Sequence, residues 1–346
     1  MAKTLPKSGF SKIIAGLVLF ALLVGVFLGY KNNFSPNVTD KEGYLYIPTG
    51  STFEELMQNI QKNEILLDTA SFRRVAVKND YPQTIKAGKY ALEPGMNNRD
   101  LVRKLRAGLQ EAVKFRFQDI RLKGDFAKHV STLLEPDSAS IMQLMNNDSL
   151  AAQYGFNTEN FYSMFIPNTY EIWWNTSSEK FFERMHTEYS RFWTEERLNK
   201  AKAINLTPNE VSVLASIVKG EAMHNDEMPT IAGLYLNRLE RGILLQADPT
   251  VIFAAQDFTI RRVLNKHLAI QSPYNTYLNR GLPPGPITLP SIASIDAVLN
   301  PQKHDYIYMC AKDDFSGYHN FAKTMSEHLV NARKFQRALN ERNIKR

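Results

Sequence analysis

The longest uncharged apolar run of the chain lies close to its N-terminus and predicts a membrane-spanning helix. Residues 13–30 (IIAGLVLFALLVGVFLGY) form this run, which is just long enough to cross a bilayer as a helix. Three basic residues, Lys3, Lys7 and Lys12, precede it with no acid among them. By the positive-inside rule, the residues before the run stay in the cytoplasm. The pattern therefore predicts a single-pass protein with a cytoplasmic tail over residues 1–12.

A cleaved signal peptide would show a similar pattern, with small residues at a cleavage site after the apolar run. The residues at the end of the run, Gly29-Tyr30-Lys31-Asn32, match such a site poorly. We therefore predict an uncleaved transmembrane helix over residues 13–31, which holds the protein in the cytoplasmic (inner) membrane. Everything beyond this helix then lies on the extracytoplasmic side.

Short strands and helices follow the anchor and predict a small α+β module. Residues 32–42 are polar and indicate a linker. Hydrophobic periodicity and turn residues then predict two strands and three helices, over residues 44–48 (strand), 52–61 (helix), 69–78 (helix), 87–92 (strand) and 98–107 (helix). The first helix begins with a capping box in Ser51-Thr52-Phe53-Glu54. Linker and module together occupy residues 32–112.

The remaining residues, 113–346, predict a larger mixed domain, so that the whole chain is of the α+β class. A strand-like segment opens it at residues 113–117, and its clearest helices cover residues 181–193, 208–222 and 230–241. The later segments mix short strands with Pro and Gly turns; they are QADPTVIFA, SPYNTYLNRGLPPGPITLP and YIYMCAKDDFSGYHNFA.

One helix of this domain carries an acid where its apolar face should continue. Thr207-Pro208-Asn209-Glu210 combines an N-cap, a proline in the first turn and a capping-box glutamate, so we expect the helix to begin there. The apolar residues that follow keep the spacing of one buried helix face; they are Val211, Leu214, Ala215 and Val218. The next position of this stripe is Glu221.

A carboxyl on an apolar face needs a partner or a proton, because burying a bare charge is costly. Two interpretations of Glu221 follow. It is a structural acid, paired with an arginine or turned to water in a frayed last turn, or it is a carboxyl with a raised pKa that exchanges protons near neutral pH. Gly220 beside it weakens the helix, and the close approach of a ligand would explain its presence.

Charge and cysteine content exclude several classes of function. The 42 Lys and Arg residues exceed the 35 Asp and Glu residues by 7, without any block of five like charges. Nucleic-acid binding is therefore not predicted, although an acidic matrix or membrane surface would attract the chain. Cys310 is the single cysteine, which excludes an internal disulfide and a thiolate metal cluster. We predict Cys310 as a small core residue.

Glu221, His224 and Glu227 would lie on one side of a helix that continued through them. Carboxylate and imidazole groups bind metals, but the spacing is not that of HExxH and no further ligand cluster is present. We therefore predict no metal and no other cofactor. The alternative for His224 and Glu227 is a solvated helix end.

Residues suited to sugar binding gather in the Pro- and Gly-rich part of the domain. They offer hydroxyl, amide and carboxylate groups beside aromatic faces, which match the hydroxyl rim and apolar faces of a sugar ring. The substrate-binding candidates are Gln246, Asp248, Tyr274, Asn275 and Tyr277. The segment GLPPGP at residues 281–286 forms either a rigid surface turn or a stiff wall of the cleft.

The order of these motifs resembles that of the YceG-like family of endolytic murein transglycosylases. The segments that carry the resemblance are ASIVKGEA, LNRL, LLQADPTVI, SPYNTY, GLPPGPI and GYHNFA, together with His328. The similarity covers almost the whole chain, including the N-terminal anchor and a LysM-like module at the position of the small α+β module. It implies a YceG-like catalytic domain over residues 113–346.

The resemblance implies an enzyme that cuts peptidoglycan between N-acetylmuramic acid and N-acetylglucosamine, within the glycan strand. The cut occurs at the outer face of the cytoplasmic membrane, near cell-wall synthesis proteins, and would limit the length of nascent strands. The catalytic glutamate of the family corresponds to Glu221. It protonates the leaving oxygen and then takes the proton of the muramic acid C6 hydroxyl, which attacks its own anomeric carbon and forms a 1,6-anhydro ring.

Two departures from the family pattern and two alternatives accompany this hypothesis. Lys219 and Gly220 replace the commoner Glu-Lys pair, and Asn168 stands where the family has an aspartate, so no role that needs a charge there is implied. One alternative is a hydrolytic muramidase that uses Glu221 with Asp248 or Glu227, because hydrolases normally need two carboxyls. The other is a non-catalytic scaffold that binds peptidoglycan and releases no product.

Overall fold

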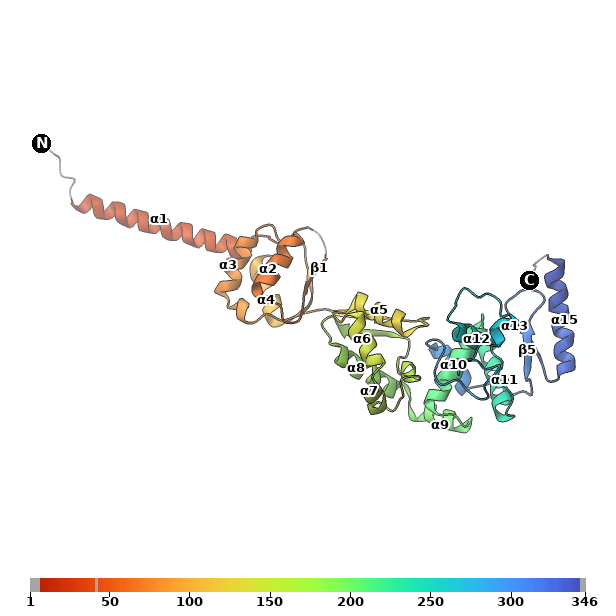
Figure 1. Cartoon of the computed structure of the whole chain (residues 1–346). Coiled ribbons are helices and arrows are strands. Elements are labelled where there is room, and N and C mark those ends of the chain that lie inside the picture. Colours follow the sequence, from red (N-terminus) through yellow and green to blue (C-terminus); the bar gives the residue numbers. More distant parts are fainter. Residues whose placement is uncertain (1–6, 41–42, 343–346) are drawn as a thin grey trace. The chain divides into compact units, whose positions relative to one another are not determined.

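The computed structural model describes residues 7–40 and 43–342, which form two compact units (Figure 1). The first unit contains the residues up to Lys114 together with Glu171–Thr176. The second contains Phe115–Tyr170 together with the residues from Ser177 on. Half of the predicted cytoplasmic tail, residues 1–6, lies outside the described residues.

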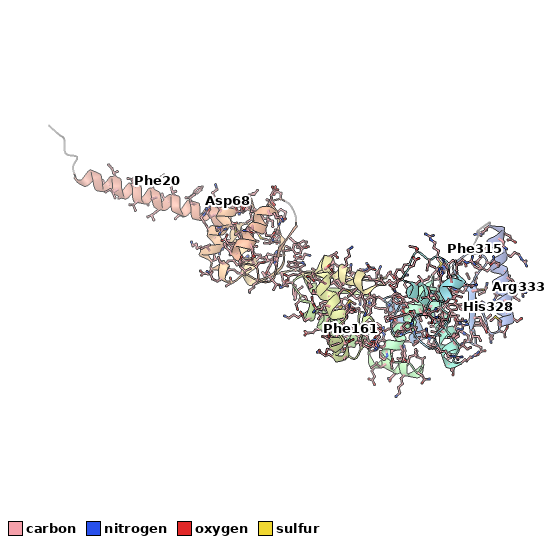
Figure 2. All side chains as sticks on the ribbon, in the orientation of Figure 1. Phe20, Asp68, Phe161, Phe315, His328 and Arg333 are labelled. Atoms are coloured by element: carbon pink, nitrogen blue, oxygen red, sulfur yellow. The ribbon has the colours of Figure 1, made fainter. Side chains whose placement is uncertain are left out.

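Helix α1 (Lys7–Phe34) contains the predicted apolar run and extends beyond it at both ends. From Lys12 to Phe34 it is long and apolar enough to cross a membrane. Its side chains are largely uncovered: Leu17, Phe20 and Val26 are 64%, 66% and 70% exposed, and Phe20 is labelled in Figure 2. The length and the exposed apolar surface of α1 fit a membrane anchor.

The first unit has the predicted strands and helices, each within two residues of its expected bounds. Strands β1 (Gly43–Ile47) and β2 (Gly88–Leu92) pair antiparallel. The helices are α2 (Phe53–Lys62), α3 (Thr69–Lys78), α4 (Asn98–Ala107) and a 3-10 turn, η1 (Tyr81–Gln83). Their core is fully buried and includes Leu45, Ile47, Ile60, Phe72, Tyr90, Leu101 and Leu105. The capping box of α2 uses Thr52 and Glu55, one residue later than predicted.

The segment after α1 is not the free linker that its polarity predicted. Asn37 and Val38 are 3% and 2% exposed. The Asn37 amide donates to the Asp68 carbonyl (2.9 Å) and to Oδ1 of Asn98 (2.6 Å), and its Oδ1 accepts the Asp68 N–H (2.7 Å). Asn37 therefore joins the N-terminal ends of α3 and α4, and its burial is tolerated because its polar groups are paired.

Aromatic side chains fill the N-terminal part of the second unit. Strand β3 (Ala112–Arg116) pairs with β4 (Thr169–Trp173), and of these two strands only residues 115–116 and 169–170 belong to this unit. The helices here are α5 (Lys123–Leu133), α6 (Ser138–Met145), α7 (Asp148–Gln153), η2 (Phe161–Met164) and α8 (Ser178–Phe192). The ring centroid of Phe126, on α5, lies 4.6 Å from that of Phe165 and 5.0 Å from that of Phe117. Phe115, Phe165 and Phe181 are fully buried around this ring.

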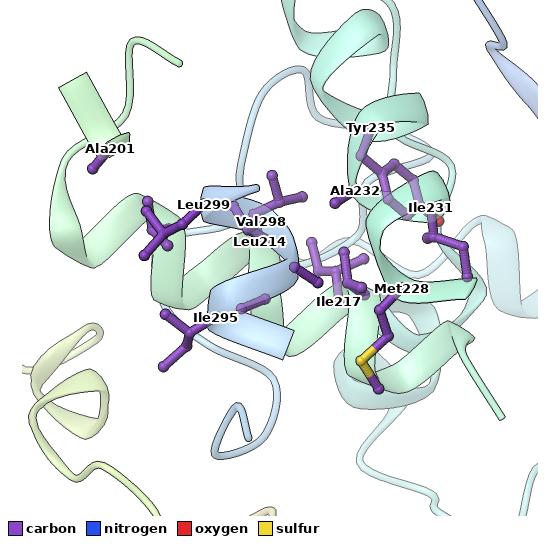
Figure 3. Close-up of a cluster of buried hydrophobic side chains, with 14 of the residues drawn as sticks. Ala201, Leu214, Ile217, Met228, Ile231, Ala232, Tyr235, Ile295, Val298 and Leu299 are labelled. Carbon is purple, nitrogen blue, oxygen red and sulfur yellow. The ribbon is translucent and has the colours of Figure 1, made fainter. Parts of the chain in front are cut away.

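The rest of the second unit is built around α10 (Pro208–Glu221). Helices α11 (Met228–Glu240) and α14 (Ile292–Leu299) pack against it, and α9 (Glu195–Ala203) precedes it. Figure 3 shows the buried side chains of this core, among them Leu214, Ile217, Ile231, Ala232, Ile295, Val298 and Leu299. The helices predicted over residues 208–222 and 230–241 are thus confirmed within two residues at each end.

The structure corrects the prediction for QADPTVIFA, where short strands were expected. Residues Asp248–Ala255 form helix α12, with Pro249 in its first turn, where a proline needs no N–H partner. Beyond it lie α13 (Asn265–Leu268), the antiparallel hairpin of β5 (Tyr308–Ala311) and β6 (His319–Ala322), and α15 (Met325–Glu341). Helix α15 lies beside β5 (Figure 1).

The burial of Asn37 predicts where a shortened chain must begin. A chain that starts at residue 32 keeps Asn37, whereas one that starts at residue 43 removes the partner of Oδ1 of the buried Asn98 and of the part-buried N–H of Asp68. Each such group costs about 1–3 kcal/mol. We expect the free energy of unfolding of the first unit to be lower in the shorter chain by at least about 2 kcal/mol, as measured by urea denaturation.

Single substitutions separate this effect from chain length. Asn37→Ala in the longer chain should cause most of the same loss, whereas Asn63→Ala, at an exposed position, should change the stability little. Equal stability of the two shortened chains would contradict the assignment of residues 33–38 to the folded module.

Candidate active site

Glu221 is the last residue of α10 and lies at the end of the apolar stripe that singled it out. The predicted capping box between Thr207 and Glu210 is present and starts the helix. Leu214 and Val218 of the stripe are fully buried. The stripe faces α11 and α14, so the carboxyl that follows it is directed toward protein rather than water.

Tyr235 of α11 holds the carboxyl of Glu221. Tyr235 is 1% exposed, and its hydroxyl donates a hydrogen bond of 2.8 Å to Oε1 of Glu221. Burial raises the pKa of Glu221 to about 7; the bond from Tyr235 acts in the opposite direction, and the nearby charge of Asp248 adds to the increase. The partner is thus a phenol rather than the arginine expected for a structural acid. Glu221 can hold and release a proton near neutral pH, as a general acid must.

Gly220 has a structural role that replaces the ligand contact predicted for it. A Cβ atom added at Gly220 would lie 2.8 Å from Cβ and 3.0 Å from Cγ of Pro249. The missing side chain therefore lets the first turn of α12 pack against the last turn of α10. This packing brings Asp248, the neighbour of Pro249, to the site of Glu221.

Glu221 lines a cavity of about 410 Å³, a volume suited to a small ligand or part of a polymer. Three of the predicted substrate-binding residues, Gln246, Asp248 and Tyr277, line the same cavity. Other walls come from Tyr235 and Arg238 of α11, Tyr308 and Cys310 of β5, His319 of β6 and His328 of α15. Figure 2 shows the side chains on the ribbon, with His328 labelled on α15.

Asp248 and Gln246 are each held by one neighbour. The Tyr277 hydroxyl donates a hydrogen bond of 2.6 Å to Oδ1 of Asp248. Oε1 of Gln246 accepts a bond of 3.3 Å from Arg238. The backbone of Gln246 is left-handed, with φ of 51°. Residues other than glycine and asparagine seldom adopt this conformation, and where they do, it is often at a functional site.

Arg238 joins the elements that enclose the cavity and was not predicted. It is 7% exposed. Its Nε donates to the Ile307 carbonyl (2.7 Å), and its Nη1 donates to the carbonyls of Leu244 (3.2 Å) and Leu245 (2.5 Å). A buried guanidinium is costly unless its donors are paired, so these bonds fix the loop after α11 against the segment before β5.

His328 contributes a neutral imidazole to the cavity wall. Its ring stacks on Tyr308 with the centroids 5.3 Å apart. Burial, and secondly the charge of Arg238, lowers the pKa of His328. Its Nδ1 is buried and has no hydrogen-bond partner among the described residues.

A helix that continued from Glu221 through His224 and Glu227 was considered from the sequence, but the structure does not contain it. Helix α10 ends at Glu221, and residues Asn225–Glu227 form a short 3-10 turn, η3. His224 stacks on Tyr318, with ring centroids 4.1 Å apart. The alternative of a solvated helix end is wrong for Glu227, because its side chain is 5% exposed and lies 2.7 Å from Nδ1 of His319. The described residues contain no group of three or more His, Cys, Asp or Glu that could hold a metal ion.

The structure places the other two substrate-binding candidates away from Glu221. Asn275 is fully buried, and its amide donates to the carbonyls of Leu268 (2.9 Å) and Ile270 (2.8 Å). Tyr274 contacts Phe253, with ring centroids 4.7 Å apart, and lines a separate cavity of about 450 Å³. Asn275 therefore stabilises a loop, whereas Tyr274 belongs to a second concave surface.

The GLPPGP segment is neither a surface turn nor a wall of the Glu221 cavity. Pro283, Gly285 and Pro286 are buried. A Cβ atom at Gly285 would lie 2.2 Å from the Glu159 carbonyl oxygen, so the segment passes close to the loop before η2. Pro286 lines the second cavity beside Tyr274.

Lys219 and Asn168, the departures from the family pattern, line a third cavity of about 420 Å³. Nζ of Lys219 lies 3.5 Å from a carboxylate oxygen of Asp119, and both side chains are partly exposed. The side-chain Oδ1 of Asn168 accepts a hydrogen bond of 2.8 Å from the backbone N–H of Thr169. Neither residue lines the cavity of Glu221.

Sequence reasoning did not identify the groups that orient the site. Tyr235 and Arg238 lie within the predicted helix, three residues apart, and such spacing places both on one helix face. A polar pair on a buried face was the available signal.

Cys310, predicted as a core residue, is partly exposed and lines the Glu221 cavity.

Comparison with known proteins gives one consistent result. The profile of the YceG-like family matches residues 45–334. An endolytic murein transglycosylase of Bacillus subtilis is 29% identical, over 93% of each chain. An endolytic murein transglycosylase of Streptococcus pneumoniae is 27% identical over 91% of this chain, which spans 63% of that protein. A crystal structure of a YceG-like protein from Listeria monocytogenes has a TM-score of 0.55 at 25% identity, covering 84% of this chain and 99% of that one.

The raised pKa of Glu221 predicts a stability gain when its charge is removed. The carboxyl has a pKa of about 7 in the folded protein, against an ordinary value of 4.5. The folded state therefore binds the proton more tightly, and the free energy of unfolding falls as the pH rises from the lower to the higher value. This difference corresponds to an upper bound of about 3 kcal/mol.

Glu221→Gln should therefore be more stable than the wild type at pH 8 by up to about 3 kcal/mol, and the gain should vanish at pH 4. Thermal and urea unfolding at the two pH values measure the difference. A substitution of the exposed Glu240 by Gln serves as the control. An equal difference between Glu221→Gln and wild type at both pH values would contradict the assignment.

Gly220→Ala should disturb the site through α12. The added Cβ atom would meet Pro249 at 2.8 Å, and overpacking of this kind costs about 1–3 kcal/mol. We expect lower stability together with a shift of Asp248 away from Glu221. Gly124→Ala on α5 is the matched control, because an added Cβ atom there meets nothing within 4 Å. Unchanged stability and an unchanged crystal structure of Gly220→Ala would refute the packing role.

Proposed function

The chain belongs to the YceG-like family, and from this premise we propose that it is a lytic transglycosylase that cleaves the glycan strands of peptidoglycan. The observation that carries the proposal is the carboxyl of Glu221, which lies in a cavity with a pKa of about 7 and a hydrogen bond from Tyr235. The names of the curated relatives support the same substrate and reaction.

The reaction begins with proton transfer from Glu221 to the oxygen that links N-acetylmuramic acid to N-acetylglucosamine. A carboxyl with a pKa close to the working pH is protonated in about half of the molecules and is still acidic enough to give up its proton, and such catalysis contributes about 10²–10⁴-fold. Tyr235 keeps the carboxyl in one orientation and does not itself titrate, because burial raises its pKa well above the usual value.

The nucleophile is the C6 hydroxyl of the muramic acid, which attacks C1 of the same sugar. Because this hydroxyl is part of the substrate, the reaction is intramolecular and the effective concentration of the nucleophile is high. In its simplest form Glu221, now a carboxylate, takes the proton of this hydroxyl. The product is a 1,6-anhydromuramic acid end, and no water is consumed.

The first unit and α1 suit delivery of this activity to the cell wall. We assign residues 32–112 to a LysM-like module that binds glycan, and residues 113–346 to the catalytic domain. Helix α1 anchors the chain in the cytoplasmic membrane with its N-terminus inside, so that the catalytic domain is periplasmic or otherwise extracytoplasmic. Cutting within strands at this surface, near cell-wall synthesis proteins, would limit the length of nascent strands.

Hydrolysis is the second candidate function, and Asp248 is the observation that favours it. Asp248 lines the same cavity as Glu221, and hydrolases of glycosidic bonds normally use two carboxyls. The one-carboxyl mechanism assigns Asp248 to substrate binding, where the Tyr277 hydroxyl fixes its orientation.

The products of the purified full chain in detergent, incubated with peptidoglycan, distinguish these functions. We expect each new end to be a 1,6-anhydro sugar that is one water lighter than a hydrolysed end, resists borohydride reduction and gains no label from heavy-oxygen water. Labelled, reducible ends would establish hydrolysis, and the absence of new ends would establish a binding scaffold.

Glu221→Gln completes this test, because it preserves the shape of the side chain but cannot donate and accept a proton in turn. Its turnover should fall by at least about 10²-fold. Early products should be long fragments if the cut lies within the strand, and disaccharides if the enzyme acts from an end.

A further inference from the structure

The carboxyl of Glu227 forms two hydrogen bonds with His319 at the edge of the Glu221 cavity. Its Oε1 accepts the backbone N–H of His319 at 2.7 Å, and its Oε2 lies 2.7 Å from Nδ1 of the same residue. The side chains of Glu227 and His319 are 5% and 14% exposed. Two bonds to one residue fix both the position of β6 and the rotation of the imidazole ring.

This arrangement determines which ring nitrogen is free. An ionised carboxylate only accepts hydrogen bonds, so Nδ1 of His319 carries the proton and donates to Glu227. In the neutral ring the other nitrogen, Nε2, then has a lone pair. Among the described residues no group bonds to Nε2, although the side chain lines the cavity. A histidine that is held at Nδ1 by a carboxylate and is free at Nε2 has the geometry of a general base.

The proposed reaction contains a step that requires a base. The C6 hydroxyl must lose its proton as its oxygen bonds to C1. We propose that His319 is this base, with Nε2 taking the proton of the attacking hydroxyl while Glu221 serves as the acid alone. The assignment rests on the proposed transglycosylase function and divides between two residues the proton transfers that a single carboxyl would otherwise perform.

Atoms and charges balance in this scheme. The bond from the C6 oxygen to C1 forms, and the bond from C1 to the leaving oxygen breaks. The leaving oxygen keeps the electron pair and receives the proton of Glu221. The enzyme is left with an imidazolium at His319 and a carboxylate at Glu221. Transfer of one proton from Nε2 to Glu221, directly or through water, restores both residues without any co-reactant.

Other titratable and charged groups surround His319 and enter any pH profile. They come from several elements: Glu221 on α10, Asp226 and Glu227 on η3, Tyr235 and Arg238 on α11, Asp248 on α12, Tyr277 in the loop after α13, Tyr308 and Cys310 on β5, Lys312 and Tyr318 between the strands, and His328 on α15. Of these, Glu227 bonds directly to the ring.

His319→Asn in the full chain tests the proposal, because it separates a catalytic role from a structural one. The asparagine amide can donate to Glu227 in place of Nδ1, but nothing replaces Nε2. We expect normal binding to peptidoglycan, an unchanged melting temperature and a loss of turnover of at least about 10²-fold. His186→Asn, at a histidine that stacks on Tyr154 outside the cavity, is the control.

Turnover of His319→Asn within about threefold of wild type would refute the proposal. His319 would then have only a structural role, through its hydrogen bonds to Glu227. Glu227→Gln provides a second test, because its amide can donate to Nδ1 and move the ring proton to Nε2; we expect a similar loss of at least about 10²-fold. Reducible wild-type ends would instead refute the transglycosylase function itself. If neither variant folds, nitrogen NMR of the wild type decides: a proton on Nδ1 of the neutral ring supports the assignment, and a proton on Nε2 overturns it.

Discussion

The active site that we propose depends on one hydrogen bond, from the hydroxyl of Tyr235 to the carboxyl of Glu221. Burial alone favours the protonated carboxyl, whereas an arginine partner would lower its pKa by about 1–3 units and keep it ionised. A phenol lies between these cases, because it stabilises the carboxylate without adding a charge. The resulting pKa of about 7 makes both protonation states accessible at neutral pH. The choice of partner therefore determines whether the acid is structural or reactive.

The surrounding fold keeps this bond in place by packing regular elements rather than loops. Helices α10, α11 and α14 share one apolar core, so Glu221 and Tyr235 project from two rigid neighbours. Gly220 permits α12 to approach to within van der Waals contact, which brings Asp248 to the site. Arg238 then ties the opposite wall to α11 through backbone carbonyls. Glu221, Tyr235 and Arg238 are therefore positioned by the buried contacts of α10 and α11, as a precise site requires.

The sequence allowed the helices with clear periodicity to be predicted within about three residues of their observed ends, and a break in one apolar stripe identified Glu221. Local pattern failed where a residue's role depends on a distant partner. Asn37 is buried because Asn98, 61 positions away, completes its hydrogen bonds. Glu227 is buried because its carboxyl forms hydrogen bonds with His319, 92 positions away. Asn275 offered the chemistry of a sugar-binding residue, but the same amide satisfies two loop carbonyls. Helix α12 was missed because a short apolar run after a proline does not distinguish a helix from a strand.

Glu221 and Glu227 lie close together in the chain but have different hydrogen-bond partners. Glu221 ends α10 and Glu227 directly precedes α11; Glu227 is buried, and Glu221 is partly exposed. Burial and the nearby charge of Asp248 lead Glu221 to retain a proton, and the hydrogen bond from the phenol of Tyr235 opposes them without adding a charge. Glu227 meets a backbone N–H and an imidazole, two groups that require an acceptor. The first arrangement makes a carboxyl that exchanges protons, and the second makes one that orients a neighbour. One short connection between two helices can thus supply both an acid and the support for a base.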